Sequence, residues 1–445
     1  MYDPLISQRV MPNLSLPKSY WHGTYQCQSP SSLTHNITTE YLIVGGGYTG
    51  LSAAMTLAEA GKAPVLIDAN ALGFGCAGRN GGFILSGSGR MSLNAIEAKW
   101  GCDIADSMKK EFDGAVNLLK SRIQQYDMQV DLADGPYFKL AHTAKQAGVL
   151  HSNATALATR FKDPSTLLSK QEIENKFAIK GVFGGVEVKG ACLHPLKLAD
   201  EYARVAQMLG ATLYYHTPAL NIEKHPSGFV VTTPTGVINA KHVLLASNAY
   251  TPKHFNKLVD NKQFPVQSSI FVTSPMSEQQ KNATGLNGPM SFMDTRMMKY
   301  YYRVLPDGRL LFGGRGAVTG QHADKPQERQ RLYRAMLKSF PALEGITMDY
   351  FWSGWVSVSL DNMPRIFVEE KQNNASRMGY AMGYCGSGVS FAAFAGMRLA
   401  QRMLDDSEIN LSLPLYQSPL PSYPFASFRR LALRGLYQWA KVAER

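Results

Sequence analysis

The segment from residue 41 to 68 constrains the fold most, because its parts follow the order of a dinucleotide-binding βαβ unit. An apolar run leads into Gly45, Gly47 and Gly50, a small-residue helix is predicted next, and a second apolar run ends at Asp68. Such a turn lets a pyrophosphate approach the backbone at the N-terminus of the helix. An acid about 20 residues further on can accept hydrogen bonds from a ribose. It would repel a 2′-phosphate, so NADP is disfavoured and FAD and NAD stay open.

Composition limits the class of protein. With 445 residues, 45% of them hydrophobic, the chain can form two domains or one domain with a long insertion. No apolar stretch of about 18 residues and no signal-peptide pattern occurs, so we expect a cytoplasmic protein. The 5 cysteines lack CxxC spacing and the 10 histidines lack HExxH spacing, so we predict no metal site. The net charge of +12 is spread along the chain without a recognition motif, so we expect no nucleic-acid partner.

A second glycine-rich turn, at residues 383–388, leads into a helix predicted over 388–404. A helix N-terminus stabilises partial negative charge. A flavin gains such charge at its pyrimidine edge on reduction, whereas a nicotinamide cofactor needs no second helix dipole. The turn therefore favours FAD, and the alternative is that its glycines only cap a core helix.

Patterns along the chain predict two domains. Helical periodicity indicates one long helix over 92–128, and Ser169 begins a capping box. Alternating aromatic-rich segments over 265–315 predict an antiparallel sheet. The expected class is α/β, with a Rossmann-like FAD-binding domain and a mainly antiparallel α+β substrate domain. The expected boundaries are an arm at 1–36, the FAD-binding domain at 37–90, 190–262 and 320–410, the substrate domain at 91–189 and 263–319, and a basic segment at 411–445.

Six blocks of sequence together resemble the FAD-dependent amine and amino-acid oxidoreductases of the D-amino-acid oxidase superfamily, and gamma-glutamylputrescine oxidoreductases among them. The blocks are residues 44–53, 73–82, 193–199, 243–250, 309–314 and 383–389. The resemblance implies a fold of the glutathione-reductase and D-amino-acid-oxidase type. It also implies non-covalent FAD, because residues 352–361 lack the cysteine that tethers the cofactor in sarcosine-oxidase-like members.

The resemblance further implies which residues bind the cofactor. It places Tyr48 and Thr49 at the pyrophosphate, Asp68 at the ribose, and the 386–389 turn beneath the isoalloxazine. The chain departs from the usual family residues at Cys76 and Ala77 and at Cys385 to Ser387. The implied set is Gly45, Gly47, Tyr48, Thr49, Gly50, Asp68, Ala69, Gly75, Gly78, Arg79, Asn80, Gly81, Gly82, Ala246, Asn248, Gly354, Gly386, Ser387, Gly388 and Val389.

For catalysis, the resemblance implies hydride transfer from the carbon beside an amine to flavin N5, giving an imine that water hydrolyses. Tyrosines 300 to 302 alternate between the two faces of a predicted strand, so at least one can face the flavin. Arg303 or Lys299 could bind a carboxylate. The residues predicted to act in catalysis are Tyr300, Tyr302, Arg303 and Ser387.

The expected substrate is a small amine or amino acid, such as a gamma-glutamylputrescine-like polyamine derivative or L-pipecolate. Ser390 stands where sarcosine-oxidase-like members carry a substrate-binding lysine, which disfavours simple N-methyl amino acids. The electron acceptor is O2 or a quinone. Two other classes stay open: a flavoprotein that modifies or matures a partner protein, and an NAD-dependent dehydrogenase.

The C-terminal stretch 428–445 is amphipathic if helical, with Leu431, Leu436, Trp439 and Val442 on one side and basic residues elsewhere. Such a helix either docks on its own protein or makes a peripheral contact with an anionic bilayer.

Overall fold

Five parallel strands form the centre of the first sheet in the computed structural model, which describes residues 2–28, 31–371 and 376–443. Their order is β17 (Met378–Met382), β10 (Val237–Leu245), β1 (Ile37–Val44), β2 (Val65–Ile67) and β7 (Thr212–Tyr214). Antiparallel strands extend this sheet: β16 (Arg365–Val368) beside β17, and β9 (Gly228–Thr232) and β8 (Asn221–His225) beyond β10. The carboxyl ends of β1, β2 and β10 therefore share one edge, where open α/β sheets bind ligands.

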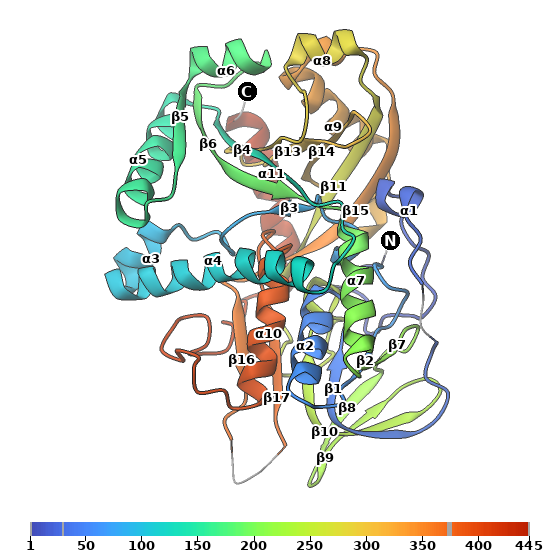
Figure 1. Ribbon diagram of the computed structural model, residues 1–445. Helices are drawn as coiled ribbons and strands as arrows, with labels where there is room; N and C mark the ends of the chain where they lie inside the picture. Colours follow the sequence, from blue (N-terminus) through green and yellow to red (C-terminus); the bar gives the residue numbers. More distant parts are fainter. Residues whose placement is uncertain (1, 29–30, 372–375, 444–445) are drawn as a thin grey trace.

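Three helices cover one face of this sheet: α2 (Tyr48–Glu59), α7 (Pro195–Met208) and α10 (Phe391–Met403) (Figure 1). Their apolar faces share a core with α4 (Cys102–Gln125). Helix α2 is buried almost all round because α7 and α10 flank it. Gly396 brings α10 onto α2, since a Cβ at this position would lie 2.0 Å from the carbonyl oxygen of Thr49.

The second sheet is mixed but mainly antiparallel, with β12 and β4 as the parallel pair among the described strands. Its order is β15 (Met348–Val358), β11 (Phe264–Pro275), β14 (Arg309–Arg315), β13 (Tyr301–Val304), β12 (Ser291–Asp294), β4 (Ala133–Ala141), β6 (Gly184–Cys192) and β3 (Phe83–Ile84), with β5 (Ser165–Ser169) on β6.

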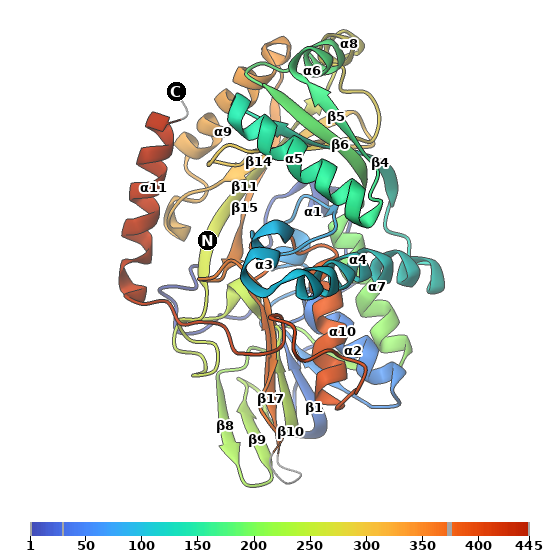
Figure 2. The same cartoon turned by 90° about the vertical axis from the view of Figure 1, so that its left-hand side faces the viewer.

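Helix α5 (Ala144–Phe161) packs on β4 and β6 from one side of the second sheet. The helices that lie over the other side are α6 (Lys170–Phe177), α8 (Glu278–Thr284) and α9 (Pro326–Ser339) (Figures 1 and 2). An aromatic core that includes Phe138, Phe177 and Phe292 fills the space beneath them. The opposite face is turned toward the first sheet. Single turns of 3-10 helix lie at Cys76–Gly78, Asn248–Tyr250, Gly320–His322, Pro341–Leu343 and Ala426–Phe428.

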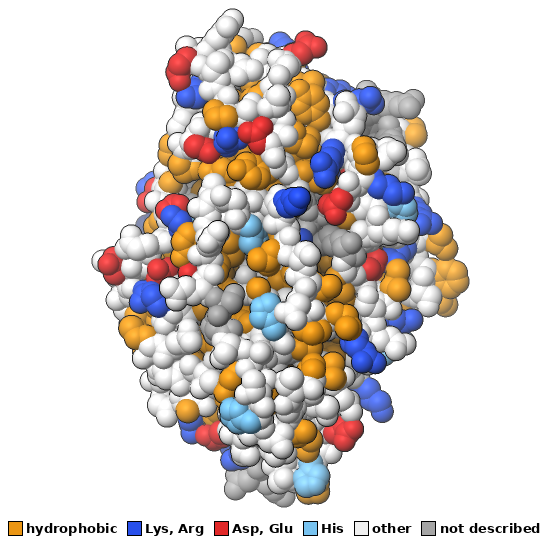
Figure 3. Space-filling view, turned by 90° about the vertical axis from the view of Figure 1, so that its right-hand side faces the viewer, with side chains coloured by type: hydrophobic (Ala, Val, Ile, Leu, Met, Phe, Trp, Pro, Cys, Tyr) orange, Lys and Arg blue, Asp and Glu red, His pale blue; other side chains and the backbone are white. Residues whose placement is uncertain are grey.

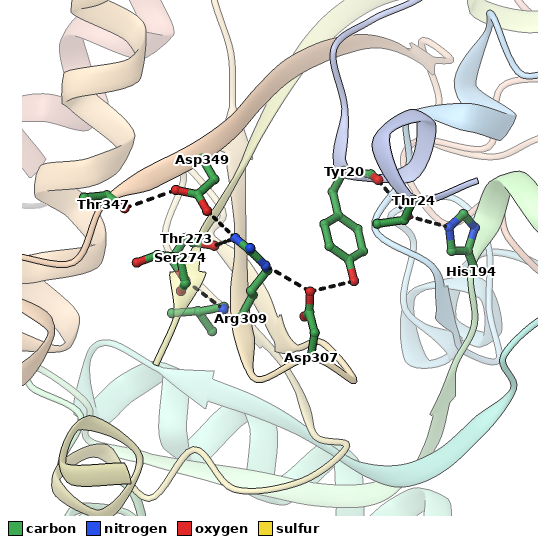
Figure 4. Close-up of polar contacts among 10 residues, drawn as sticks. Tyr20, Thr24, His194, Thr273, Ser274, Asp307, Arg309, Thr347 and Asp349 are labelled. Atoms are coloured by element: carbon green, nitrogen blue, oxygen red, sulfur yellow. Dashed lines mark hydrogen bonds and ion pairs between the residues drawn. The ribbon is translucent and has the colours of Figure 1, made fainter. Parts of the chain in front are cut away.

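The N-terminal arm contains a short helix, α1 (Tyr20–Thr24), that is pinned to both parts of the molecule. The hydroxyl of Tyr20 donates to Asp307 at 3.0 Å, and Arg309 joins Asp307 to Asp349 (Figure 4). On the other side, Thr24 Oγ1 lies 3.2 Å from His194 Nε2 (Figure 4). The arm thereby clamps the second sheet to the start of α7.

The expected single helix over 92–128 is wrong: the structure has α3 (Leu93–Trp100) and α4 (Cys102–Gln125). The chain breaks at Gly101, whose φ of +89° ends the first helix. Apolar positions recur every four residues across the break, so the periodicity did not reveal it. The structure also groups residues 83–84 and 348–358 with the second sheet, whereas we expected them in the FAD-binding domain.

The C-terminal helix α11 (Arg429–Ala443) stands on the flank of the second sheet, near α9 (Figure 2). Leu433, Tyr437 and Ala440 pack inward, and Arg430 forms an ion pair with Asp3 of the arm. Helix α11 therefore docks on its own protein, which was one of the two alternatives expected for this segment. No helix within the described residues is long and apolar enough to cross a membrane.

Candidate active site

One cavity of about 330 Å³ extends from the first glycine-rich turn to the second, between the two sheets. Its wall includes residues 44–49 of the first turn and residues 384–390 of the second. The two turns are more than 300 residues apart in the sequence. A single elongated ligand can therefore contact both of them.

The first turn combines two glycines that pack against backbone with one that faces open space. Gly45 has a φ of +118°, and a Cβ there would lie 2.7 Å from the backbone of Ala246. A Cβ on Gly50 would lie 1.9 Å from the carbonyl oxygen of Gly45. Gly47 has nothing within 4 Å of its Cβ position and lines the cavity. No side chain caps α2, so its first N–H groups are available to an anionic ligand.

Asp68 ties the end of β2 to this turn. Its Oδ2 accepts a hydrogen bond from the N–H of Gly46 at 2.7 Å, and its Oδ1 accepts one from the N–H of Asn70 at 2.9 Å. Burial raises the pKa of Asp68, while these two donors and His216 act to lower it. The carboxylate lines the cavity together with Ala69, where it would accept a hydrogen bond from a ribose hydroxyl of a bound dinucleotide.

The loop over 73–82 forms the next part of the wall, and its polar side chains are used for internal support. Arg79 donates to the carbonyl oxygens of Phe74 and Ser353, at 2.6 and 2.9 Å. Asn80 donates to the hydroxyl of Tyr48 at 3.2 Å. The indole of Trp21 in the arm donates to the carbonyl oxygen of Asn80 at 2.9 Å.

Most of the residues predicted to bind the cofactor line this cavity, and three do not. Gly50 and Gly78 make room for backbone, because a Cβ on Gly78 would lie 2.1 Å from the carbonyl oxygen of Gly73. Gly82 has a φ of +74° and packs against Leu193. The structure places on the cavity wall Gly45, Gly47, Tyr48, Thr49, Asp68, Ala69, Gly75, Arg79, Asn80, Gly81, Ala246, Asn248, Gly354, Gly386, Ser387, Gly388 and Val389.

The second turn holds its shape through left-handed backbone at Cys385, with φ +55°, and Gly386, with φ +106°. The N–H of Cys385 donates to the carbonyl oxygen of Ser357 at 2.8 Å, which anchors the turn to β15. No side chain caps α10, because the hydroxyl of Ser390 donates instead to the carbonyl oxygen of Leu85. The start of α10 is thus a second helix N-terminus turned toward the cavity.

The structure places Tyr301 on the cavity wall, and not the predicted Tyr300 and Tyr302. Tyr300 and Tyr302 point into the aromatic core, where the ring of Tyr302 stacks on Phe292 and Phe312 with centroids 4.8 and 5.4 Å apart. The alternation along β13 was expected, but the sequence did not show which set faces inward. The hydroxyl of Tyr301 lies 2.7 Å from that of Ser268, and burial raises the pKa of Tyr301 to about 12.

Arg303, the other predicted side chain on this strand, also lies away from the cavity. Its guanidinium donates to the carbonyl oxygens of Gly82 and Leu193, at 3.3 and 3.0 Å, and lies over the ring of Trp21. It is buried and braces the loop that carries Gly82. Its position is that of a structural residue.

Three cationic side chains line the cavity at the end near Tyr301: Lys299, Arg315 and, at the exposed rim, Arg90. Within the described residues, none of the three side chains forms an ion pair or hydrogen bond. Burial and the charges of Arg90 and Arg315 lower the pKa of Lys299 to about 8. Burial and Arg90 lower the pKa of Arg315 to about 10. The nearby Asp294 is already paired with Arg296 at 2.6 Å.

The arrangement suits FAD followed by an anionic small molecule. In a bound FAD, the uncapped N–H groups of α2 would face the pyrophosphate, Asp68 the ribose and the second turn the flavin ring. Unpaired cations at the far end attract a carboxylate. Among the described residues, no group of three or more His, Cys, Asp or Glu side chains is placed to hold a metal ion.

The sequence over residues 40–402 matches a family model described as FAD dependent oxidoreductase, DAO. Gamma-glutamylputrescine oxidoreductase of Escherichia coli (strain K12) is 30% identical over 416 residues, which are 93% of this chain and 94% of that protein. Glycine oxidase of Bacillus subtilis (strain 168) is 24% identical, over 83% of this chain and 94% of that protein.

Solved structures share the fold. L-Proline dehydrogenase from P. horikoshii superposes with a TM-score of 0.68 at 19% identity, over 85% of this chain and 96% of that one. Glycine oxidase from Geobacillus kaustophilus superposes with a TM-score of 0.68 at 18% identity, over 87% and 99%.

Proposed function

Since the chain belongs to the DAO family of FAD-dependent oxidoreductases, we propose that it oxidises the C–N bond of a small amine or amino acid that carries a carboxylate. The candidates are a polyamine derivative of the gamma-glutamylputrescine kind and a cyclic amino acid such as L-pipecolate. One observation carries the proposal: both glycine-rich turns and a cluster of unpaired cations line the same cavity.

FAD, when bound, supplies the hydride acceptor of this reaction. The uncapped start of α2, with Gly47 and Thr49, would hold its pyrophosphate, and Gly386 to Val389 would lie against its ring. Cys76 lines the cavity, but its thiol donates to the carbonyl oxygen of Trp355 at 2.6 Å and burial raises its pKa to about 12. Covalent attachment needs a thiolate, so we propose non-covalent FAD.

The three cationic side chains on the cavity wall favour some substrates over others. Lys299, Arg315 and Arg90 attract a carboxylate and repel an unmodified polyamine, which carries only positive charge. The same field lowers the pKa of a substrate ammonium and so favours the neutral amine, whose lone pair assists cleavage of the neighbouring C–H bond. Tyr301 and Ser387 lie on the wall and would orient the substrate. Water then hydrolyses the imine product.

The acceptor of the electrons is O2 or a quinone, and the proposed location is the cytoplasm. The 5 cysteines are all free, as in proteins of reducing compartments. Neither modification of a partner protein nor use of NAD is favoured, because the relatives are named for reactions of small amines and amino acids. Peroxide release during turnover indicates the oxidase, and turnover with a quinone analogue alone indicates the dehydrogenase.

Anaerobic mixing of the holoenzyme with single compounds tests the proposal through loss of the visible flavin absorbance. Gamma-glutamylputrescine, L-pipecolate, L-proline, glycine and putrescine form the panel. We expect at least one carboxylate-bearing compound to bleach the flavin and putrescine not to. Bleaching by putrescine alone, or by no compound, contradicts the proposal.

A matched pair of variants tests the role of the cations. Lys299→Met is expected to raise KM for the carboxylate substrate about tenfold or more, since a charge-assisted hydrogen bond is lost. Lys189→Met makes the same chemical change on the exposed surface of β6 and serves as the control. Equal KM values for the two variants would remove Lys299 from the substrate site.

A further inference from the structure

Helix α11 has an apolar outer face as well as an apolar inner one. Leu433 and Ala440 are buried against the protein. On the opposite side, Leu431, Trp439 and Val442 are 57%, 60% and 70% exposed. Helical spacing sets these residues, with Leu436, in one continuous strip along the helix. Nothing within the described chain covers the strip, and the helix stands on the outside of the molecule (Figure 2).

Two further exposed aromatic side chains lie in the turn before the helix. Phe425 and Phe428 are 82% and 60% exposed. Other large exposed apolar residues, such as Val149 on α5 and Met208 on α7, lie on separate elements. Scattered apolar side chains are ordinary, whereas a contiguous group of aromatic and aliphatic residues marks a surface that another apolar phase covers.

The charge around the strip indicates which kind of apolar surface covers it. Arg434 is exposed and lies along one border of the strip, while no acidic residue occurs between residues 425 and 443. The whole chain carries +12, with basic side chains spread over its surface, as the face in Figure 3 shows. An anionic lipid surface attracts this charge, and the strip matches helices that lie in the bilayer interface with Trp and Leu on the buried side.

We propose that the outer face of α11 docks the protein on an anionic bilayer, with Trp439, Leu431 and Val442 inserted among the lipid headgroups and acyl chains. The helix lies in the membrane plane and spans nothing. Because the proposal rests on this face alone, it stands or falls separately from the proposed reaction.

Vesicle flotation of the full-length holoenzyme tests the proposal. Vesicles of phosphatidylcholine with phosphatidylglycerol are compared with vesicles of phosphatidylcholine alone. We expect flotation with the anionic vesicles that weakens as salt is added. We also expect the tryptophan fluorescence to shift to shorter wavelength, because Trp439 is 60% exposed, whereas Trp100 is half-buried and Trp21, Trp352 and Trp355 are buried. Trp439→Phe removes the shift and keeps flotation.

The double variant Leu431→Glu/Trp439→Glu changes two exposed residues and should leave the fold intact. It is expected to lower vesicle affinity about tenfold or more, because apolar contact is lost and negative charge is added. Val149→Glu/Met208→Glu makes the same change in charge elsewhere and is expected to bind as the wild type does. Circular dichroism and flavin absorbance confirm that each variant is folded.

Three outcomes overturn the proposal. One is absence of flotation with anionic vesicles, and another is equal flotation of the two double variants. The third is a dimer in analytical ultracentrifugation that Leu431→Glu/Trp439→Glu dissociates, without any vesicle binding, which assigns the face to a second copy of the chain.

Discussion

The contact between α2 and α10 predicts a large effect from adding one methyl group. In Gly396→Ala the new Cβ would lie 2.0 Å from the carbonyl oxygen of Thr49 and 3.1 Å from the backbone nitrogen of Ala53. Ordinary contact begins at 3.4 Å, so the helices must separate by about 1.4 Å. Overpacking of this kind costs about 1–3 kcal/mol of unfolding free energy. We expect the upper end of this range, because a backbone atom cannot rotate away.

The same shift should weaken FAD binding. Thr49 lies at the start of α2 on the cavity wall, and its hydroxyl is 2.8 Å from that of Tyr384, beside the second turn. Separation of α10 from α2 therefore changes the spacing between the two turns that line the cofactor site. Thermal unfolding followed by circular dichroism measures stability, and fluorescence titration of the apoprotein measures the Kd of FAD.

Gly435→Ala in α11 is the matched control. Its Cβ would meet nothing within 4 Å, so alanine is expected to stabilise the helix by about 0.5–1 kcal/mol. The two substitutions should thus shift the thermal midpoint in opposite directions. A Gly396→Ala protein that unfolds at the wild-type midpoint and binds FAD with the wild-type Kd refutes the reasoning.

Three further substitutions are predicted from single contacts. Lys299→Met should raise the thermal midpoint at pH 7, because the folded protein lowers the pKa of this amine from 10.5 to about 8. The stability of the wild type then rises between pH 8 and pH 10.5, since the unfolded chain binds more protons in this range. Thermal melts over this pH range should show the advantage of the variant disappear. Arg303→Met should lower the free energy of unfolding by about 1–3 kcal/mol, because the carbonyl oxygen of Leu193 loses its donor; KM in steady-state assays should stay unchanged. Asp68→Ala leaves the N–H groups of Gly46 and Asn70 without acceptors, so FAD titration should give a higher Kd, and an unchanged Kd would exclude the assigned role.

Local signals in the sequence predicted local structure well. The capping box at Ser169 is present, with its hydroxyl accepting from the N–H of Glu172. Helix α7 begins at Pro195 and ends just before Gly210, as the Pro-to-Gly spacing indicated. The βαβ unit at residues 41–68 also formed as expected, because turn, helix and strand are each encoded by adjacent residues.

The sequence did not predict features that depend on contacts between segments far apart in the chain. The face of β13 that meets the cavity is decided by pairing with β12 and β14, so the sequence could not choose Tyr301 over its neighbours. The cationic cluster is formed by three separate segments, which contribute Arg90, Lys299 and Arg315. No spacing pattern in the sequence predicts that these residues meet. The pairing of β13 with β14 brings Lys299 and Arg315 together, and the loop after β3 adds Arg90.

The inner face of α11 has a consequence for the cavity. Leu433 packs with Cys385, and Cys385 forms part of the cavity wall. The inner side of α11 therefore belongs to the same apolar cluster as the turn at the start of α10. A tilt of α11 (Arg429–Ala443) would therefore change the packing around Cys385, so this helix supports a wall of the cavity as well as closing the fold.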